Sequence, residues 1–410
     1  MYGRFAVFTQ IRQYSLRRAN LPISIANYEG FQQSLNFNDT LKRIHSLYLE
    51  NKIQAVDGHN HEISTKLNSL RSLPRTSIPK AEIFEKVLLD PKIGAWRKPI
   101  MKWIRLGVFL MKYYKNGMQA TYATFKDTKP IKKMFEEKAN VPMVTQLFKS
   151  IEMNEIEFQK NLHSNLVHIP ITRNNFVEYH RRNQAWKLPS FFLVAAIFEE
   201  LTAVICYLFP RVVPYNCLTP GGFKKIAKKN INNTVKFDSS NLKYQSPYTI
   251  SGDLLHQSLT GRLPQKYISP WQLKVCKLSN NKRIPSESLM YVYQHMFVDD
   301  WLYLQHIFNE DITKISYEEL VNSILERKLY TREEDLGAMV NTDAGRKVLL
   351  WRLFLYWSFR FDGCVSVSQP GKTDGLLFSE KWGINNISIH NFPGTLNGEL
   401  VSESNLKHFE

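Results

Sequence analysis

The longest apolar stretch of the chain is residues 188–210, where charge appears only at the centre, at Glu199 and Glu200. Proline stands near each end, at Pro189 and Pro210. A helix rises about 1.5 Å per residue, so about 20 apolar residues cross a hydrocarbon core of about 30 Å. The stretch therefore predicts a single transmembrane helix at 188–210. A buried helix of a soluble protein is the alternative.

The two central carboxylates are the unusual feature of this stretch. A charge at the middle of a bilayer costs about 2.5–3.5 kcal/mol on insertion scales, so it is normally neutralised, paired or turned toward a polar cavity. Glu199 and Glu200 are therefore the candidate transmembrane proton or ion site. A packing contact between helices is the alternative.

A second hydrophobic pattern covers residues 91–126, which contain eight Lys or Arg and no carboxylate. Apolar side chains recur at helical spacing on one side, and basic side chains occupy the other. The apolar side comprises Ile100, Trp103, Ile104, Val108 and Met111. The pattern predicts amphipathic helices across 91–187 that lie on a membrane or against the spanning helix. Packing on protein is the alternative.

The rest of the chain predicts a helical domain between less regular ends. Residues 15–90 form a variable polar region, and residues 211–365 read as a soluble, all-helical domain. A capping box, Ser316 with Glu319, predicts the start of one helix. The predicted helices of this domain are 270–278, 286–297, 317–327 and 344–359. A tail rich in Gly, Asn and Ser, residues 366–410, is expected to be flexible.

Charge and the N-terminus indicate the compartment and the kind of partner. The formal charge of +17 suits RNA or an anionic membrane surface. The first 28 residues contain arginine but no carboxylate, which is typical of a mitochondrial transit peptide. Arg12, Tyr14 and Ser15 resemble a processing site, so residues 1–14 are the expected transit peptide. A basic run follows the apolar stretch and is a candidate contact for a ribosome or for lipid: Lys224, Lys225, Lys228 and Lys229.

No sequence motif supports enzymatic chemistry, a metal site or a cofactor. The four cysteines form no C-x-x-C pair, which argues against zinc and against a disulfide framework. The segment Gly371-Lys372-Thr373 lacks the glycine five residues earlier that a phosphate-binding loop requires. We therefore expect no enzyme activity, no metal and no cofactor.

Several motifs around the apolar stretch resemble the LETM family of mitochondrial inner-membrane proteins, as a short, divergent fungal-type member without an EF-hand. The Leu208-Phe209-Pro210 sequence continues to Pro214, and Glu199 precedes Pro210 by eleven residues. Further similar segments follow in order over about residues 95–340: Thr172-Arg173, Ile268-Ser269-Pro270, Val298-Asp299-Asp300 and Glu318-Glu319-Leu320.

This resemblance implies a single-pass inner-membrane protein whose ribosome-binding-like C-terminal domain lies in the matrix. It implies support of potassium/proton exchange and of matrix ion and volume homeostasis, with Glu199 as the protonatable residue. Because one helix cannot enclose a path, a homo-oligomer or a partner membrane protein is expected. The alternative function is a membrane-tethered receptor for the mitochondrial ribosome, or an assembly factor for inner-membrane proteins.

Overall fold

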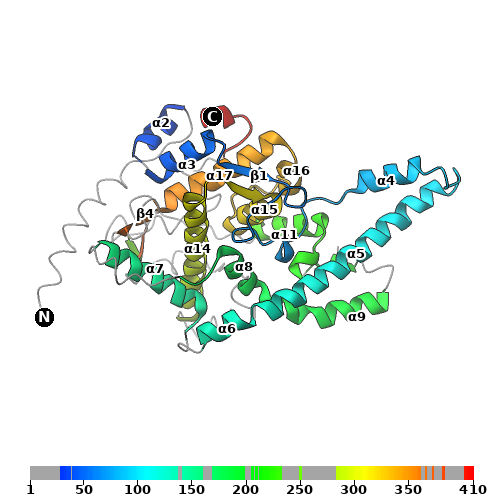
Figure 1. Cartoon of the computed structure of the whole chain (residues 1–410), viewed down its shortest axis with the longest axis horizontal. Coiled ribbons are helices and arrows are strands. Elements are labelled where there is room, and N and C mark those ends of the chain that lie inside the picture. Colours follow the sequence, from blue (N-terminus) through cyan, green and yellow to red (C-terminus); the bar gives the residue numbers. More distant parts are fainter. Residues whose placement is uncertain are drawn as a thin grey trace, which may run out of the picture.

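The structure of the chain is a computed structural model (Figure 1). The described residues are 28–37, 39–136, 141–159, 169–198, 205–206, 208–210, 212–232, 249–251, 283–361, 365–366, 372–373, 381–383 and 401–410. Over these residues the chain is predominantly helical with a few short strands, which confirms the mostly α fold class.

The first half of the chain supplies one side of the body and a long projecting hairpin. Its elements are α2 (Tyr28–Phe37), α3 (Asp39–Leu49), β1 (Ile53–Val56), η1 (Leu70–Ser72), α4 (Lys80–Leu89), α5 (Lys98–Asp127), α6 (Lys129–Glu136), α7 (Met143–Gln159), α8 (Arg173–Arg181), η3 (Arg182–Lys187) and α9 (Leu188–Phe198).

The second half supplies most of the core. Its elements are η5 (Tyr215–Cys217), α11 (Pro220–Asn232), β2 (Thr249–Ser251), α14 (Arg283–Asn309), β3 (Thr313–Ser316), α15 (Tyr317–Arg327), α16 (Leu336–Val340), α17 (Asp343–Phe361), β4 (Val365–Ser366), β5 (Lys372–Thr373), β6 (Lys381–Gly383) and η8 (Leu406–His408). Helices α15 and α17 cover the predicted 317–327 and 344–359, whereas α14 is longer than the predicted 286–297. The predicted helix 270–278 lies outside the described residues.

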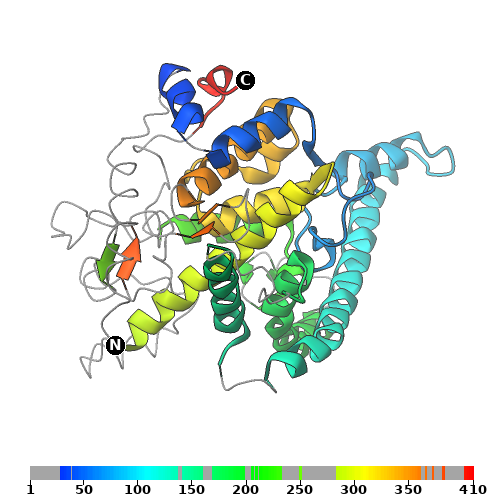
Figure 2. The same cartoon turned by 60° about the vertical axis from the view of Figure 1, so that its left-hand side comes forward.

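Helix α17 lies at the centre of the main hydrophobic core. Its Trp351 and Trp357 are fully buried, and Trp351 packs against Phe31 of α2. Phe409 near the C-terminus also packs on Trp351, and Figure 2 shows the C-terminal segment beside α2. Residues 401–410 belong to the tail that was expected to be flexible, yet Phe409 is 2% exposed. Helix α2 and the C-terminal segment 401–410 thus share one core.

The sequence predicted a capping box at the start of α15, and the structure forms its N-cap half only. The Ser316 hydroxyl accepts a hydrogen bond from the Glu319 backbone N–H at 3.1 Å. The Glu319 carboxylate instead accepts from the Ser69 backbone N–H and from Arg173. The Ser316 backbone N–H donates to the Asn68 side chain.

The strand that leads into α15, β3, pairs in parallel with β1, in the register Ile53↔Thr313. This pairing joins segments that are far apart in the chain. No local sequence pattern predicted it.

A buried network of charges links α8, α14 and α15. Arg173 contacts Asp299 at 3.0 Å and Glu319 at 2.8 Å, and Arg327 contacts Asp299 at 2.6 Å and Asp300 at 2.5 Å. Burial opposes the ionisation of Asp299, but the two guanidinium groups hold its pKa below the ordinary value. Such paired charges fix the positions of the three helices relative to one another.

Candidate membrane-docking surface

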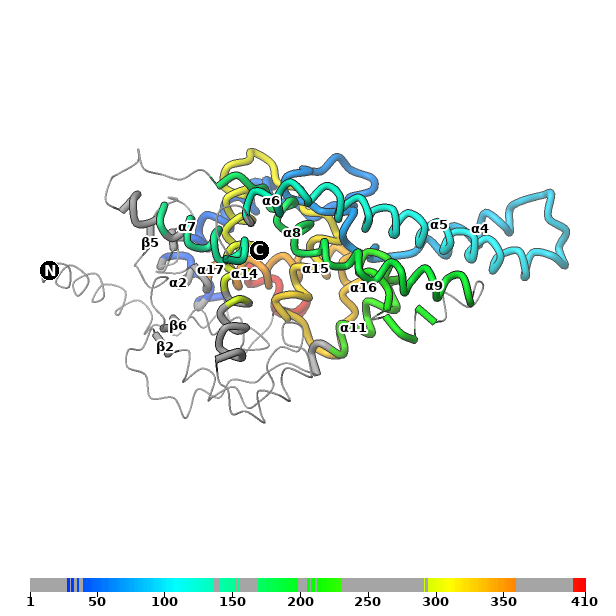
Figure 3. Tube along the Cα trace, turned by 90° about the horizontal axis from the view of Figure 1, so that it is seen from below, coloured from blue at the N-terminus to red at the C-terminus, as the bar shows by residue number. Residues whose placement is uncertain are grey.

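Helices α4 and α5 form a hairpin that projects well beyond the body of the molecule (Figure 3). The two helices pack against each other through Phe84 and Trp103, whose rings meet edge to face at 5.5 Å. The Lys80 ammonium lies over both rings, 5.3 Å from the Phe84 centroid and 5.1 Å from the Trp103 centroid. The hairpin is therefore held by its own side chains along this part.

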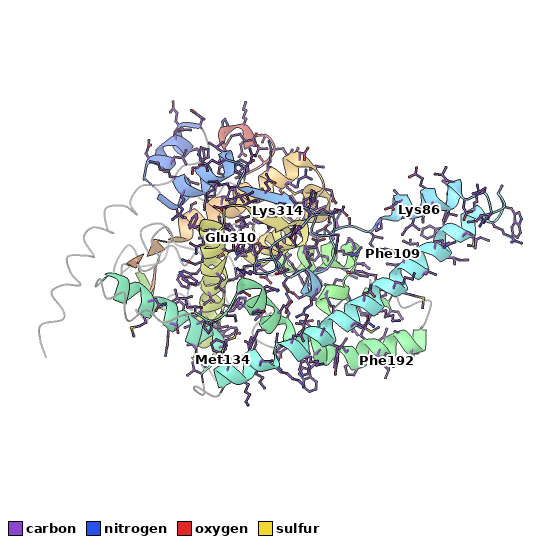
Figure 4. All side chains as sticks on the ribbon, viewed as in Figure 1. Lys86, Phe109, Met134, Phe192, Glu310 and Lys314 are labelled. Carbon is purple, nitrogen blue, oxygen red and sulfur yellow. The ribbon has the colours of Figure 1, made fainter. Side chains whose placement is uncertain are left out.

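Large apolar side chains of the hairpin stand in solvent, clear of the body (Figure 4). On the first half of α5 they recur at helical spacing, as predicted for 91–126, and each is at least 45% exposed, although Trp103 also packs on Phe84 of α4. We call the following set the hairpin apolar face: Leu88, Leu89, Trp96, Ile100, Trp103, Ile104, Val108 and Met111. Trp96 and Met111 are each 72% exposed. Contiguous exposed apolar surface of this kind marks a binding site for lipid or protein.

The second half of α5, in contrast, is fixed to the body. The Tyr113 hydroxyl lies 2.9 Å from the Asn216 carbonyl and 2.8 Å from the Leu218 carbonyl. The Asn216 amide donates to the Gly117 carbonyl at 2.9 Å. A Cβ on Gly117 would lie 2.4 Å from the Cys217 sulfur, so only glycine permits this approach. The hairpin is thus a rigid extension of a well-anchored helix.

Helix α9 runs alongside α5 and carries a second exposed apolar surface. Phe191 is buried against Tyr114 of α5, with ring centroids 5.7 Å apart. The opposite face of α9 exposes Phe192, Leu193 and Ile197, and Figure 4 labels Phe192 on this outer side. We call these three residues the α9 apolar face. One face of the helix is therefore buried in protein and the other is open.

The expected transmembrane helix at 188–210 is not supported. Tyr114 packs against Phe191 and also interacts with Cys206. In one straight helix, residues 15 positions apart would be separated by about 22 Å, too far for both to meet one tyrosine. In the part of the chain that the structure describes, no helix combines the length and the apolar character needed to cross a membrane.

Comparison with known proteins identifies the family. The family described as "Pentamidine resistance factor domain" matches residues 67–308, which is more than half of the chain and includes the hairpin and α9. The "Pentamidine resistance factor, mitochondrial" of Saccharomyces cerevisiae (strain ATCC 204508 / S288c) is 40% identical over 370 residues, 84% of this chain and 85% of the relative. The chain belongs to the pentamidine resistance factor family. No solved structure matches.

Membership of the pentamidine resistance factor family corrects the resemblance to the LETM family, which was wrong. The motifs behind that resemblance were short combinations of proline, arginine and acidic residues. In the structure, Arg173, Asp299 and Glu319 form the buried ion network, so a structural role accounts for them. The relative is named as mitochondrial, which supports the mitochondrial part of the predicted localisation.

The predicted ion-site and transit-peptide residues of this pentamidine resistance factor family member lie outside the described residues. These are Glu199, Glu200, Arg12, Tyr14 and Ser15. Among the residues that the structure does describe, no group of His, Cys, Asp or Glu could hold a metal ion. Burial raises the pKa of the Cys206 thiol to about 11 and that of Cys217 to about 12, so both stay protonated at neutral pH.

The predicted basic cluster lies on α11, on the body rather than on the hairpin. Lys224 is paired with Asp335 at 2.5 Å, and the Lys225 ammonium donates to the Leu208 carbonyl at 3.0 Å. Lys228 and Lys229 are exposed. Two of the four lysines therefore make protein contacts, and the cluster is less available than the sequence suggested.

Proposed function

We propose that this member of the pentamidine resistance factor family docks on an anionic mitochondrial membrane, into which it inserts the hairpin apolar face and the α9 apolar face. The observation that carries the proposal is the exposure of these two surfaces, one on the projecting hairpin and the other on α9. Fully burying a large apolar side chain is worth about 1.5–3 kcal/mol, so several such side chains give strong partitioning.

Charge favours a lipid surface over an apolar groove of another protein as the occupant. Residues 80–112 contain eight Lys or Arg against three carboxylates. Basic side chains close to an anionic leaflet contribute about 1 kcal/mol each. Trp96 and Trp103 are the side chains that interfacial helices place at the headgroup level.

The experiment is flotation of the purified full chain with vesicles of phosphatidylcholine alone or mixed with phosphatidylglycerol. We expect the chain to float with the mixed vesicles and to float less at high salt, because salt screens the basic side chains. A triple change, Lys98→Gln, Lys102→Gln and Arg105→Gln, should reduce flotation with anionic vesicles. A chain that stays at the bottom with both kinds of vesicle would refute the proposal.

Two further functions predicted from the sequence remain hypotheses. The hypothesis of potassium/proton exchange now rests on Glu199 and Glu200 alone. Its test is potassium-acetate swelling of mitochondria that carry Glu199→Gln. Ribosome contact depends on the exposed Lys228 and Lys229 of α11. Its test is co-sedimentation with ribosomes at low and high salt, because binding to RNA weakens steeply as salt rises. Either function would be compatible with a membrane-docked chain.

The name of the yeast relative suggests a cellular readout. We expect cells that lack this chain to change their sensitivity to pentamidine. A variant that no longer docks on membranes should behave like the deletion. If the non-docking variant restores normal sensitivity, docking is not required for that phenotype.

A further inference from the structure

A pocket of about 320 Å³ is lined by residues of the C-terminal end of α5 and of α6, α8, η3 and α14. Its lining combines aromatic rings with basic and polar groups, and the described residues that line it include no carboxylate. The residues that matter here are Phe125, Lys132, Tyr179, Arg182, Asn183 and Trp186. A lining of this composition is suited to an anion with an adjoining apolar part.

Arg182 lacks an anionic partner in the described part of the chain, unlike its neighbours. Arg173 pairs with Asp299, and Arg181 pairs with Glu326 at 2.9 Å. Arg182 instead stacks over Phe125 at 5.2 Å and over Tyr179 at 5.8 Å, and its Nη1 has no hydrogen-bond partner among the described residues. A guanidinium nitrogen withdrawn from water without an acceptor is costly, and a nearby phosphate would offset that cost.

The position of the pocket indicates where the anion comes from. Trp186 on its rim is 79% exposed, and two residues later the chain enters α9. Phe192 on the α9 apolar face follows Arg182 by ten residues, about 18 Å along η3 and α9, because a 3-10 helix rises about 2.0 Å per residue and an α-helix about 1.5 Å. This distance is comparable with half of a hydrocarbon core. A lipid with its phosphate at Arg182 could therefore lay its acyl chains along α9.

We infer that this pocket binds the phosphate of an anionic phospholipid, with Arg182 and Lys132 as the cationic contacts, Asn183 as a polar donor and Trp186 at the headgroup level. This inference rests on the proposed membrane docking and adds a specific lipid site to it. The ligand chemistry is a phosphodiester. The lipid is preferred over a free phosphate because the chain passes from the exposed Trp186 of the pocket into α9, which carries the α9 apolar face.

The test is calorimetric titration of the full chain with monomeric dihexanoyl-phosphatidylglycerol, dihexanoyl-phosphatidylcholine and inorganic phosphate. We expect the phosphatidylglycerol to bind more tightly than the other two. Arg182→Gln should weaken its binding about ten- to a hundredfold, the loss typical of one charge-assisted hydrogen bond. Lys132→Gln should also weaken it. Arg332→Gln and Lys133→Gln remove equal charge from exposed positions outside the pocket and should leave binding unchanged.

The remaining outcomes separate this inference from the proposed function. Monomeric lipid needs no membrane, so absent binding together with normal flotation would overturn the pocket and leave docking intact. Equal binding of inorganic phosphate would overturn the lipid assignment, and displacement of the lipid by an oligouridylate would indicate a nucleic-acid site instead. Arg182→Lys keeps the charge but loses the planar guanidinium group, which can donate two parallel hydrogen bonds to a phosphate. We therefore expect its affinity to lie between that of the native chain and that of Arg182→Gln. Circular dichroism checks that each variant is folded.

Discussion

Removing two side chains from the hairpin apolar face should weaken membrane binding by a predictable amount. Ile104 is 50% exposed and Met111 is 72% exposed, and they lie two helical turns apart on α5. Full burial of such a side chain is worth about 1.5–3 kcal/mol, so the exposed fractions correspond to about 1 kcal/mol for Ile104 and about 1.5 kcal/mol for Met111. Together, at about 1.4 kcal/mol per tenfold, Ile104→Ser with Met111→Ser should lower the partition coefficient about 30- to 100-fold.

The assay is a partition coefficient measured by flotation over a series of lipid concentrations, with vesicles of phosphatidylcholine and phosphatidylglycerol. Ile312→Ser is the matched control, because Ile312 is 60% exposed and lies in the turn between α14 and β3, away from the hairpin. Circular dichroism checks that the serines leave α5 helical. If the double variant and the control differ by less than about threefold, the hairpin apolar face is not inserted and the reasoning fails.

Three further predictions concern stability, measured as the free energy of unfolding in urea. Gly107→Ala should raise it by up to about 1 kcal/mol, since nothing lies within 4 Å of the new Cβ, whereas Gly117→Ala should lower it by about 1–3 kcal/mol, because its Cβ would meet a cysteine sulfur at 2.4 Å. Equal effects would contradict this account of α5. Arg173→Met should cost about 3–5 kcal/mol by leaving buried carboxylates without their counter-charge, while Arg332→Met at an exposed position should change little. Burial raises the pKa of Glu318, so the folded state holds this proton more tightly than the unfolded state and its contribution is lost as pH rises through the raised pKa. Glu318→Gln should therefore be more stable than the native chain at pH above the raised pKa, and the difference should shrink in acid; a constant difference would refute the assignment.

Local patterns predicted the helices that depend mainly on neighbouring residues. Ser316 as N-cap correctly placed the start of α15, and the spacing of basic and apolar residues correctly placed the helix α5. The same spacing identified Ile104 and Met111 as an apolar side, although it left open whether protein or lipid covers them. The structure adds their exposure, which sequence alone does not provide.

Features that join distant segments could not be predicted in this way. The ion pair of Arg173 with Glu319 spans 146 positions, and each partner alone looks like an ordinary surface charge. The parallel pairing of β1 with β3 has the same character, because each strand has only four residues and no regular alternation. Arg182 likewise looks like an ordinary basic residue in the sequence. That the described residues give it no anionic partner is known only from the structure, which places α5, α6 and α14 around it.

The apolar stretch 188–210 shows why a hydropathy pattern alone can mislead. High hydropathy indicates that side chains are more stable out of water. It does not indicate whether protein or lipid surrounds them. Here Phe191 and Cys206 are buried within the protein, in a small hydrophobic cluster around Tyr114. Phe192, Leu193 and Ile197 are exposed, so the described part of the stretch still presents an apolar face to solvent. Some of the apolar side chains that predicted a spanning helix are thus buried by packing on α5. The side chains of the α9 apolar face lie on the outside of α9, where docking on a membrane surface would bury them.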